Sequence, residues 1–178
     1  MTIMLTKLPS GLTVVTDRMD SVETISIGVW VGSGTRHERS EWNGIAHLLE
    51  HMAFKGTGRR TAQAIAEEIE AVGGQLNAYT AREHTAYYAK VLSGDLALSI
   101  DILADILQNS SFDPTELERE RSVVLQEIGQ ARELCDLHFA VQLLAVASKL
   151  QTIDDSPCRH KPRMIVFLRI SVKTKYQK

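Results

Sequence analysis

Residues 47–51 read His-Leu-Leu-Glu-His. Two histidines four positions apart on a helix project from the same face, one turn apart, and both imidazoles can reach a single tetrahedral Zn²⁺. Glu50 falls within the same arc of the helix, where its carboxylate can contact a water on the metal without binding the metal itself. The pattern therefore predicts a helix that carries a hydrolytic zinc site, with Glu50 accepting the proton of the water.

An ordinary surface helix with two histidines and a glutamate is the alternative. Most other positions around the motif are apolar, namely Ile45, Ala46, Leu48, Leu49, Met52 and Phe54. A helix that is apolar nearly all round is expected to be buried, and buried His and Glu side chains need partners. A metal ion supplies such a partner, so the residues favour the zinc site and a buried motif helix.

The rest of the chain alternates between strand and helix patterns. In residues 24–31, TISIGVWV, every second residue is apolar and branched, as in a half-buried strand. Helix starts are predicted at Asn43, at Thr61, and at Asp113 followed by Pro114. The other predicted elements are strands over 4–8, 12–17, 75–80 and 85–92, and helices over 43–54, 62–72, 96–107 and 114 to about 131. This order predicts an α+β fold, with an antiparallel or mixed sheet and helices packed on one face.

A catalytic zinc site usually has three protein ligands, so one ligand remains to be found. The last predicted helix offers four carboxylates: Glu116, Glu118, Glu120 and Glu127. The first three are interleaved with arginines, as on an ordinary solvated helix face. Glu127 lies among apolar neighbours instead, and a carboxylate in apolar surroundings needs a counter-charge. The residues alone favour Glu127 over the others.

Five blocks, in order along the chain, resemble the pitrilysin-type, or inverted-motif, zinc metallopeptidases. They are LPSGLTVVTD, GVWVGSGTRHE, NGIAHLLEHMAFKGT, AEEIEAVGGQLNAYTAREHTAYYAKVL and ERERSVVLQEI. The nearest resemblance is to the bacterial branch similar to the β subunit of the mitochondrial processing peptidase. It implies that residues 1–133 form the N-terminal half-domain of such a peptidase.

The resemblance also implies which residues carry the chemistry. His47, His51 and Glu127 would bind one Zn²⁺ per chain, and Glu50 would be the general base. The family's supporting acid, seven residues before the third ligand, falls on Glu120. These roles come from the family pattern, and the spacing of His47 and His51 supports them independently.

The expected substrate is an extended peptide or an unfolded protein. The resemblance implies that Asn77 and Ala78 lie on an edge strand that pairs with the substrate backbone. It places Phe54 beside a hydrophobic pocket for the residue after the cleaved bond. The alternatives are a strand-end amide for Asn77 and a core aromatic for Phe54.

Residues 134–178 match no part of the family pattern. Residues 1–131 hold 11 Lys and Arg against 18 Asp and Glu, whereas residues 132–178 hold 9 against 4. A chain truncated, or read in a shifted frame, after about residue 133 would look like this. We expect a poorly ordered or loosely docked tail, although 137–150 and 164–172 fit a helix and a strand. Family members have a second, similarly folded half, so we expect a second homologous half or subunit as a partner.

Two other functions remain to be weighed. A non-catalytic scaffold subunit of a processing-peptidase-like complex is possible, but the complete zinc set argues against it. Nucleic-acid or membrane binding through the basic tail lacks a recognition motif, and no apolar run is long enough to span a bilayer. We therefore expect neither partner. The start of the chain resembles neither a secretory signal nor a mitochondrial presequence, so we expect a cytoplasmic location.

Overall fold

The computed structural model describes residues 2–19, 21–146 and 164–170, and the side chains of 3–19 and 21–130. Its elements are β1 (Thr2–Lys7), β2 (Thr13–Arg18), β3 (Thr24–Val31), α1 (Ile45–Ala53), α2 (Ala62–Ala71), β4 (Gln75–Thr80), β5 (Thr85–Leu92), α3 (Leu96–Gln108), α4 (Pro114–Val146) and β6 (Met164–Ile170). Short 3₁₀ turns occupy Thr35–His37, Ser40–Trp42 and Ser93–Asp95. The order of strands and helices up to α4 confirms the one predicted from sequence.

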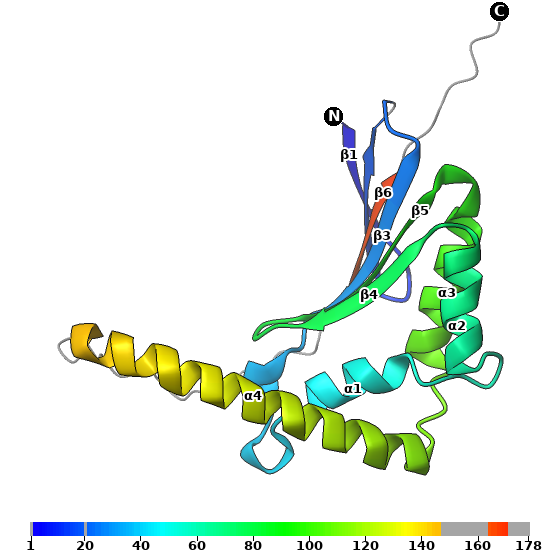
Figure 1. Ribbon diagram of the computed structural model, residues 1–178. Coiled ribbons are helices and arrows are strands. Elements are labelled where there is room, and N and C mark those ends of the chain that lie inside the picture. The colour runs from blue at the N-terminus through cyan, green and yellow to red at the C-terminus, as the bar shows by residue number, and fades with distance from the viewer. Residues whose placement is uncertain (1, 20, 147–163, 171–178) are drawn as a thin grey trace, which may run out of the picture.

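The six strands form one mixed sheet in the order β1-β2-β6-β3-β5-β4 (Figure 1). Strands β2 and β6 pair in parallel, and all other neighbours are antiparallel. The predicted α+β class with a mixed sheet is therefore confirmed. Strand β4 lies at one edge of the sheet and pairs only with β5 among the described residues.

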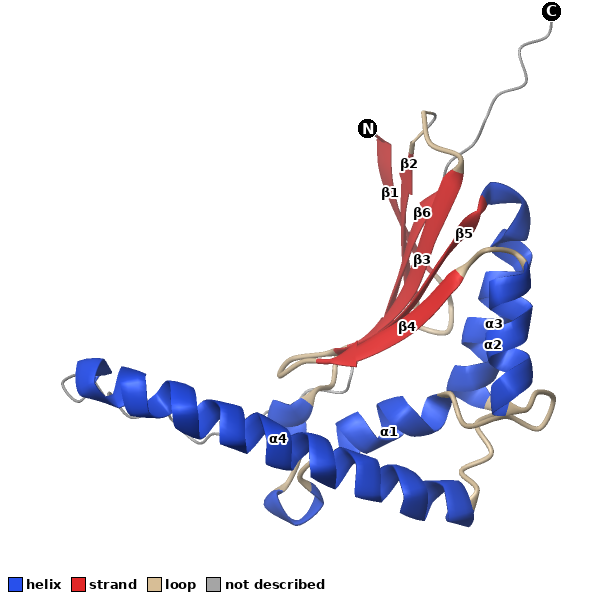
Figure 2. Cartoon of the chain, in the orientation of Figure 1, coloured by secondary structure: helices blue, strands red, loops and turns tan. Residues whose placement is uncertain are grey.

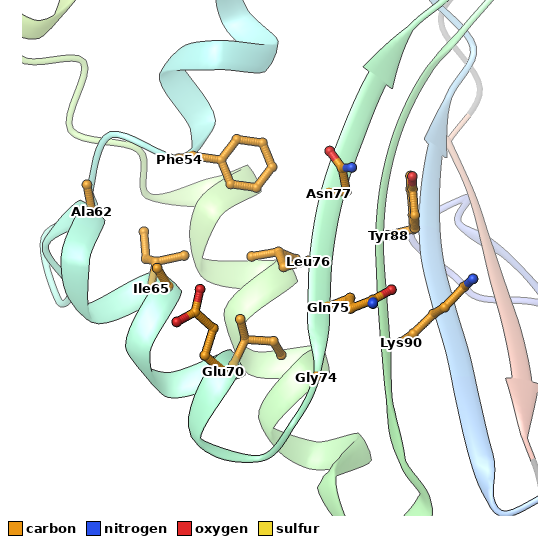
Figure 3. Close-up of a pocket in the computed structure, with 12 residues that line it drawn as sticks. Phe54, Ala62, Ile65, Glu70, Gly74, Gln75, Leu76, Asn77, Tyr88 and Lys90 are labelled. Atoms are coloured by element: carbon orange, nitrogen blue, oxygen red, sulfur yellow. The ribbon is translucent and has the colours of Figure 1, made fainter.

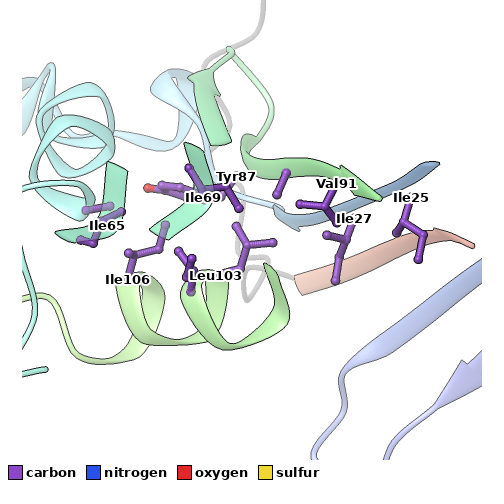
Figure 4. Packing of buried hydrophobic residues seen from close by; sticks show 11 residues of the cluster. Ile25, Ile27, Ile65, Ile69, Tyr87, Val91, Leu103 and Ile106 are labelled. Atoms are coloured by element: carbon purple, nitrogen blue, oxygen red, sulfur yellow. The ribbon is translucent and has the colours of Figure 1, made fainter. Parts of the chain in front are cut away.

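The hydrophobic core lies between the sheet and helices α2 and α3 (Figure 4). Ile25 and Ile27 of β3 are 1% and 5% exposed, as the alternation of that strand predicts. They pack with buried residues of β5, α2 and α3, which include Tyr87, Ala89, Val91, Ile65, Ile69, Ile102, Leu103 and Ile106. The described helices lie on this face of the sheet or beyond its end, and none covers the opposite face (Figure 2).

Helix α1, which carries the motif, begins differently from the prediction. Asn43 is not its cap: Gly44 occupies the N-cap with φ 97° and offers no side chain. The carboxylate of Glu38 instead accepts hydrogen bonds from the backbone N–H groups of Gly44 and Ala46, both at 2.7 Å. A charge from the preceding loop thus satisfies the free N–H groups at the helix start, and glycine tolerates the positive φ.

The prediction that the motif helix is buried throughout is wrong. Met52 and Ala53 are 1% and 4% exposed, but Ile45 and Leu49 are 42% and 43% exposed. Helix α1 packs against α4 and against the end of β4, so its C-terminal turn is enclosed while one side of its first turns stays open. Helix α1 is apolar on nearly every side, but the described part of the chain covers only some of that apolar surface.

The two other predicted helix starts are confirmed. The hydroxyl of Thr61 accepts a hydrogen bond from the backbone N–H of Ala64, at 3.1 Å. The carboxylate of Asp113 accepts from the N–H groups of Thr115 and Glu116, at 2.8 and 3.1 Å. Both are side-chain caps that supply acceptors to otherwise unpaired N–H groups.

An ion-pair network fixes the connection between α1 and α2. Arg60, whose side chain is 9% exposed, pairs with Glu68 of α2 and with Asp101 and Asp105 of α3. The side chain of Asp105 is fully buried, so the guanidinium supplies the counter-charge that it needs. The network ties the turn that follows Lys55 to both helices of the core face.

Helix α4 is longer than predicted, running to Val146 and not to about residue 131. Residues 132–146 contain no glycine or proline, so nothing local ends the helix. Strand β6, from the tail, pairs between β2 and β3. The rest of the tail, 147–163 and 171–178, lies outside the described residues, so the boundary near 133 stays a prediction. Among the described helices, none is both long and apolar enough to cross a bilayer.

Candidate metal centre

Two helices far apart in the sequence meet at the candidate metal centre, where α4 passes alongside α1 below the sheet (Figure 1). The Nε2 atoms of His47 and His51 lie 3.2 Å apart. The Oε2 atom of Glu127 lies 3.3 Å from Nε2 of His47 and 3.6 Å from Nε2 of His51. Three potential ligand atoms from two helices thus converge on one point.

These separations suit a zinc ion. A tetrahedral Zn²⁺ with bonds of about 2.0–2.1 Å holds its ligand atoms roughly 3.3 Å apart. Two imidazoles and one carboxylate are a donor set that catalytic zinc sites use, with the fourth position left for water or substrate. Among the side chains that the structure describes, no other group of three His, Cys, Asp or Glu residues converges in this way.

Glu120 supports the site from outside the ligand group. Its carboxylate accepts a hydrogen bond from Nδ1 of His51 at 2.9 Å and pairs with Nζ of Lys55 at 2.6 Å. Burial alone would raise the pKa of Glu120, but the hydrogen bonds from Lys55 and His51 outweigh it and leave that pKa below its ordinary value. Because Nδ1 of His51 carries the donated proton, its Nε2 is free to face the ligand point.

Glu50 stands beside the ligand group without joining it. Its Oε2 accepts a hydrogen bond from the hydroxyl of Thr80, at the end of β4, at 2.5 Å. The same hydroxyl lies 3.4 Å from the carbonyl oxygen of Ala46. Burial, and secondarily the charge of Glu50, raises the pKa of nearby Tyr87 to about 12. Through the hydrogen bond from Thr80, strand β4 holds the Glu50 carboxylate in place.

The burial of the two α4 carboxylates is the reverse of the prediction. Glu127 was expected in an apolar setting, but its side chain is 45% exposed, and its neighbours Val123 and Leu125 are 41% and 59% exposed. Glu120 was expected on a solvated face and is 7% exposed as a residue. Helix α4 turns the face that carries Glu120 and Val124 toward α1. The residues adjacent to each glutamate in the sequence therefore did not predict which side of the helix is buried.

The residues expected to bind substrate lie next to this centre. Asn77 and Ala78 are on β4, which is an edge strand as expected. Phe54 follows α1 and lies 6.4 Å, ring to ring, from Tyr87. A small pocket of about 230 Å³ is lined by Glu50, His51, Phe54, Lys55, Asn77 and Glu120. The structure therefore brings Phe54 and Asn77 to the metal centre and leaves the edge of β4 beside it.

Sequence reasoning missed two side chains of the site. Lys55 follows the predicted helix over 43–54, Thr80 ends the predicted strand over 75–80, and neither is predicted to take part in the site. Both lie close in sequence to residues that were singled out, but their roles depend on contacts with Glu120 and Glu50 across the fold. Two signals in the sequence could have pointed to them: Lys55 is a polar residue directly after the motif helix, and Thr80 is a polar residue at the end of an edge strand.

Residues 13–157 match the family described as Insulinase (Peptidase family M16). The chain is 53% identical over 131 residues to the probable mitochondrial-processing peptidase subunit beta of Arabidopsis thaliana, covering 74% of this chain and 25% of that protein. It is 48% identical over 119 residues to an uncharacterized zinc protease of Bacillus subtilis, covering 67% of this chain and 29% of that protein. The chain thus spans about a quarter of the length of these curated relatives.

Two solved structures share the fold. A protease from Helicobacter pylori superposes with a TM-score of 0.68 at 30% identity, covering 71% of this chain and 30% of that one. Pitrilysin superposes with a TM-score of 0.66 at 30% identity, covering 74% of this chain and 14% of that one. These likenesses confirm the predicted resemblance and the half-domain fold.

Proposed function

Because this chain belongs to the insulinase family, peptidase family M16, we propose that it carries the zinc centre of an endopeptidase that hydrolyses extended or unfolded peptides. The observation that supports this most is the spacing of three ligand atoms of His47, His51 and Glu127, with Glu50 close by and unligated. Zinc use is common to relatives named zinc proteases, and one Zn²⁺ per chain is proposed here.

Zinc, when bound, would lower the pKa of a water molecule and polarise the peptide carbonyl. Glu50 would take the proton of that water, since its carboxylate lines the pocket beside His51. Thr80 would hold the Glu50 carboxylate in one orientation through the hydroxyl hydrogen bond. Glu120 would fix the tautomer of His51 through Nδ1, and Lys55 would keep Glu120 charged.

The substrate would bind as an added strand. Strand β4 presents one row of backbone N–H and C=O groups that no second strand pairs with among the described residues, and the N–H of Ala78 donates to Oδ1 of Asn77 at 2.8 Å. An extended peptide can complete that row, and its scissile bond would then lie next to the metal centre. Asn77 and Ala78 lie on this strand and Phe54 lines the pocket beside it, so all three would contact the peptide.

A peptidase of this kind would need a second domain to enclose the substrate-binding site. Several relatives are named as a subunit of a processing peptidase, and the chain covers only part of their length. A second homologous half or subunit would therefore enclose the substrate-binding site beside β4. A scaffold role without catalysis is the second candidate, and the complete ligand set together with Glu50 disfavours it.

A cleavage assay tests the proposal. The zinc-loaded chain is incubated with a fluorogenic peptide, alone and with the separately expressed second half of a two-half relative. We expect chelator-sensitive cleavage in the presence of that half, and its loss in Glu50→Gln with zinc content unchanged, because a general base is worth about 10²–10⁴-fold in rate. Cleavage that survives in Glu50→Gln at more than a few per cent, or a chain that binds no zinc, would refute the mechanism.

A further inference from the structure

A groove of about 580 Å³ runs along the free edge of β4, between that strand and α2 (Figure 3). It shares the lining residues Phe54 and Asn77 with the small pocket at the metal centre, so the two adjoin. From Phe54 the groove extends to the start of β4, where Gly74 and Glu70 line its far end.

A peptide that added to β4 as a further strand would present its side chains on two faces, and one face would lie toward α2. Alternate residues of a strand point to opposite faces, with a repeat of about 7 Å on each face. On the helix side, such residues would meet Ile65 and Ile69, which are 2% and 4% exposed, and Leu76, which packs against the core. One residue would lie against Phe54, and the next on the same face would lie near Glu70.

The second of these two peptide positions would lie near the negatively charged side chain of Glu70. Glu70 lines the groove from α2, and in Figure 3 its carboxylate lies over that helix and points toward Ile65. Among the described residues, the side-chain carboxylate of Glu70 has no hydrogen-bond or ion-pair partner. The other ionisable groups lining the groove are Lys90 and Tyr88, and Lys90 points away from Glu70, on the other side of the strand (Figure 3). The helix side of the groove is thus an apolar channel with one unpaired negative charge.

On the basis of the proposed function, we infer that Glu70 selects a basic side chain in the substrate, a lysine or an arginine, one strand repeat beyond the residue at Phe54. The methylene stem of such a side chain would cover Ile69 and Leu76 while its charged head reaches the carboxylate. An acidic residue at that position would face Glu70 and be disfavoured. The metal centre would set where the chain is cut, and Glu70 would set which peptides are bound in register.

The test uses the full chain, zinc-loaded and carrying Glu50→Gln so that bound peptide persists. The probes are fluorescein-labelled, Thr- and Val-rich peptides in which a single lysine is walked through every position. Matched peptides carry norleucine or glutamate at the same place. Binding is measured by fluorescence anisotropy at low and high salt. Glu70→Gln and Glu70→Lys are compared with Glu67→Gln, an exposed glutamate on the same helix that does not line the groove.

We expect one lysine position to bind about three- to fivefold more tightly than its norleucine match, the scale of a solvent-accessible ion pair. That preference should vanish in Glu70→Gln, turn toward the glutamate peptide in Glu70→Lys, and persist in Glu67→Gln. High salt should weaken it.

Two results would overturn the inference and separate it from the proposed function. Peptides that bind with the same lysine preference in Glu70→Gln, or with a preference equal at every position, would remove Glu70 from recognition and leave the β4 groove standing. Peptides that fail to bind at all would refute strand addition at β4, and the role of Glu70 with it.

Discussion

At the scale of single residues, the candidate metal centre depends on charged groups that hold the candidate ligands in place. His51 is the clearest case, because one ring nitrogen faces the ligand point while the other is bound by Glu120. Glu120 is in turn paired with Lys55. The carboxylate therefore accepts from two donors at once, which a neutral side chain of the same shape cannot do as well.

Glu120→Gln should lower the zinc affinity of the chain by about 10–100-fold, although Glu120 is not a ligand. The glutamine amide has one acceptor oxygen and one donor NH₂, whereas His51 and Lys55 both donate to this position. Competition with a chromophoric zinc chelator measures the change. Glu118→Gln, at an exposed position on the same helix, is the control and should bind zinc as the unaltered chain does. Equal affinities in both variants would contradict this role for Glu120.

At the scale of elements, the connection between α1 and α2 is held by a buried charge. Arg60→Met would leave Asp105 without its guanidinium partner. Removing one partner of a buried pair costs about 3–5 kcal/mol in the free energy of unfolding. Arg59→Met, at a neighbouring arginine whose side chain is 56% exposed, should cost far less. Urea unfolding followed by circular dichroism compares the two, and similar losses would show that the network is not buried in solution.

The same network should make stability depend on pH through Asp105. Burial raises the pKa of this carboxyl, but hydrogen bonds from Asn109, Thr57 and Arg60 outweigh it and the pKa lies below its ordinary value. A lowered folded-state pKa stabilises the fold above the unfolded pKa of about 4, and that contribution is lost as pH falls through the folded value. Asp105→Asn should therefore be markedly less stable than the unaltered chain at pH 7, and the difference should shrink below about pH 4. A difference that is constant from pH 7 to pH 3 would contradict this.

A glycine fixes how the loop after β3 meets the β4–β5 turn. A Cβ atom added at Gly34 would lie 2.2 Å from the carbonyl oxygen of Ala81 and 2.7 Å from that of Arg82. Both contacts are with backbone, which cannot move aside cheaply. Gly34→Ala should lower the midpoint of thermal unfolding by several degrees, as expected for a loss of roughly 1–3 kcal/mol from overpacking. Gly94→Ala, where an added Cβ meets nothing within 4 Å, should leave the midpoint nearly unchanged.

At the scale of the whole molecule, the described domain leaves apolar surface at the site uncovered. Leu49 on α1 and Leu125 on α4 are 43% and 59% exposed, and both helices carry candidate metal ligands. Apolar patches beside a functional site mark contact surfaces or aggregation liabilities. The proposed second half would cover this surface and help to orient the peptide.

The 178-residue chain alone should therefore bind zinc yet show low solubility and little hydrolysis of a fluorogenic peptide. Orientation of a bound substrate is worth several orders of magnitude in rate, about 10⁵ or more in favourable cases. Light scattering and the cleavage assay measure both properties. Robust, chelator-sensitive cleavage by the chain alone, near the rate of a two-half relative, would show that the second half contributes less than we expect.

Sequence alone was enough to predict the order of the elements and the placing of two imidazoles on one helix face. Alternation marked β3, the side chains of Thr61 and Asp113 marked two helix starts, and the spacing of His47 and His51 marked a two-ligand face. These signals succeed because they depend on residues within one or two turns of each other. The cytoplasmic location and the boundary near residue 133 stay predictions.

Which side of each element is covered depends on the tertiary packing. It buried Glu120 and left Glu127 half exposed, put Glu38 at the start of α1, and inserted β6 between β2 and β3. Each of these depends on how segments distant in the chain cross: His51 and Glu120 are 69 residues apart in sequence and 2.9 Å apart in space. Local periodicity gives the faces of a helix, but the partner that covers a face is chosen by the packing of the entire fold.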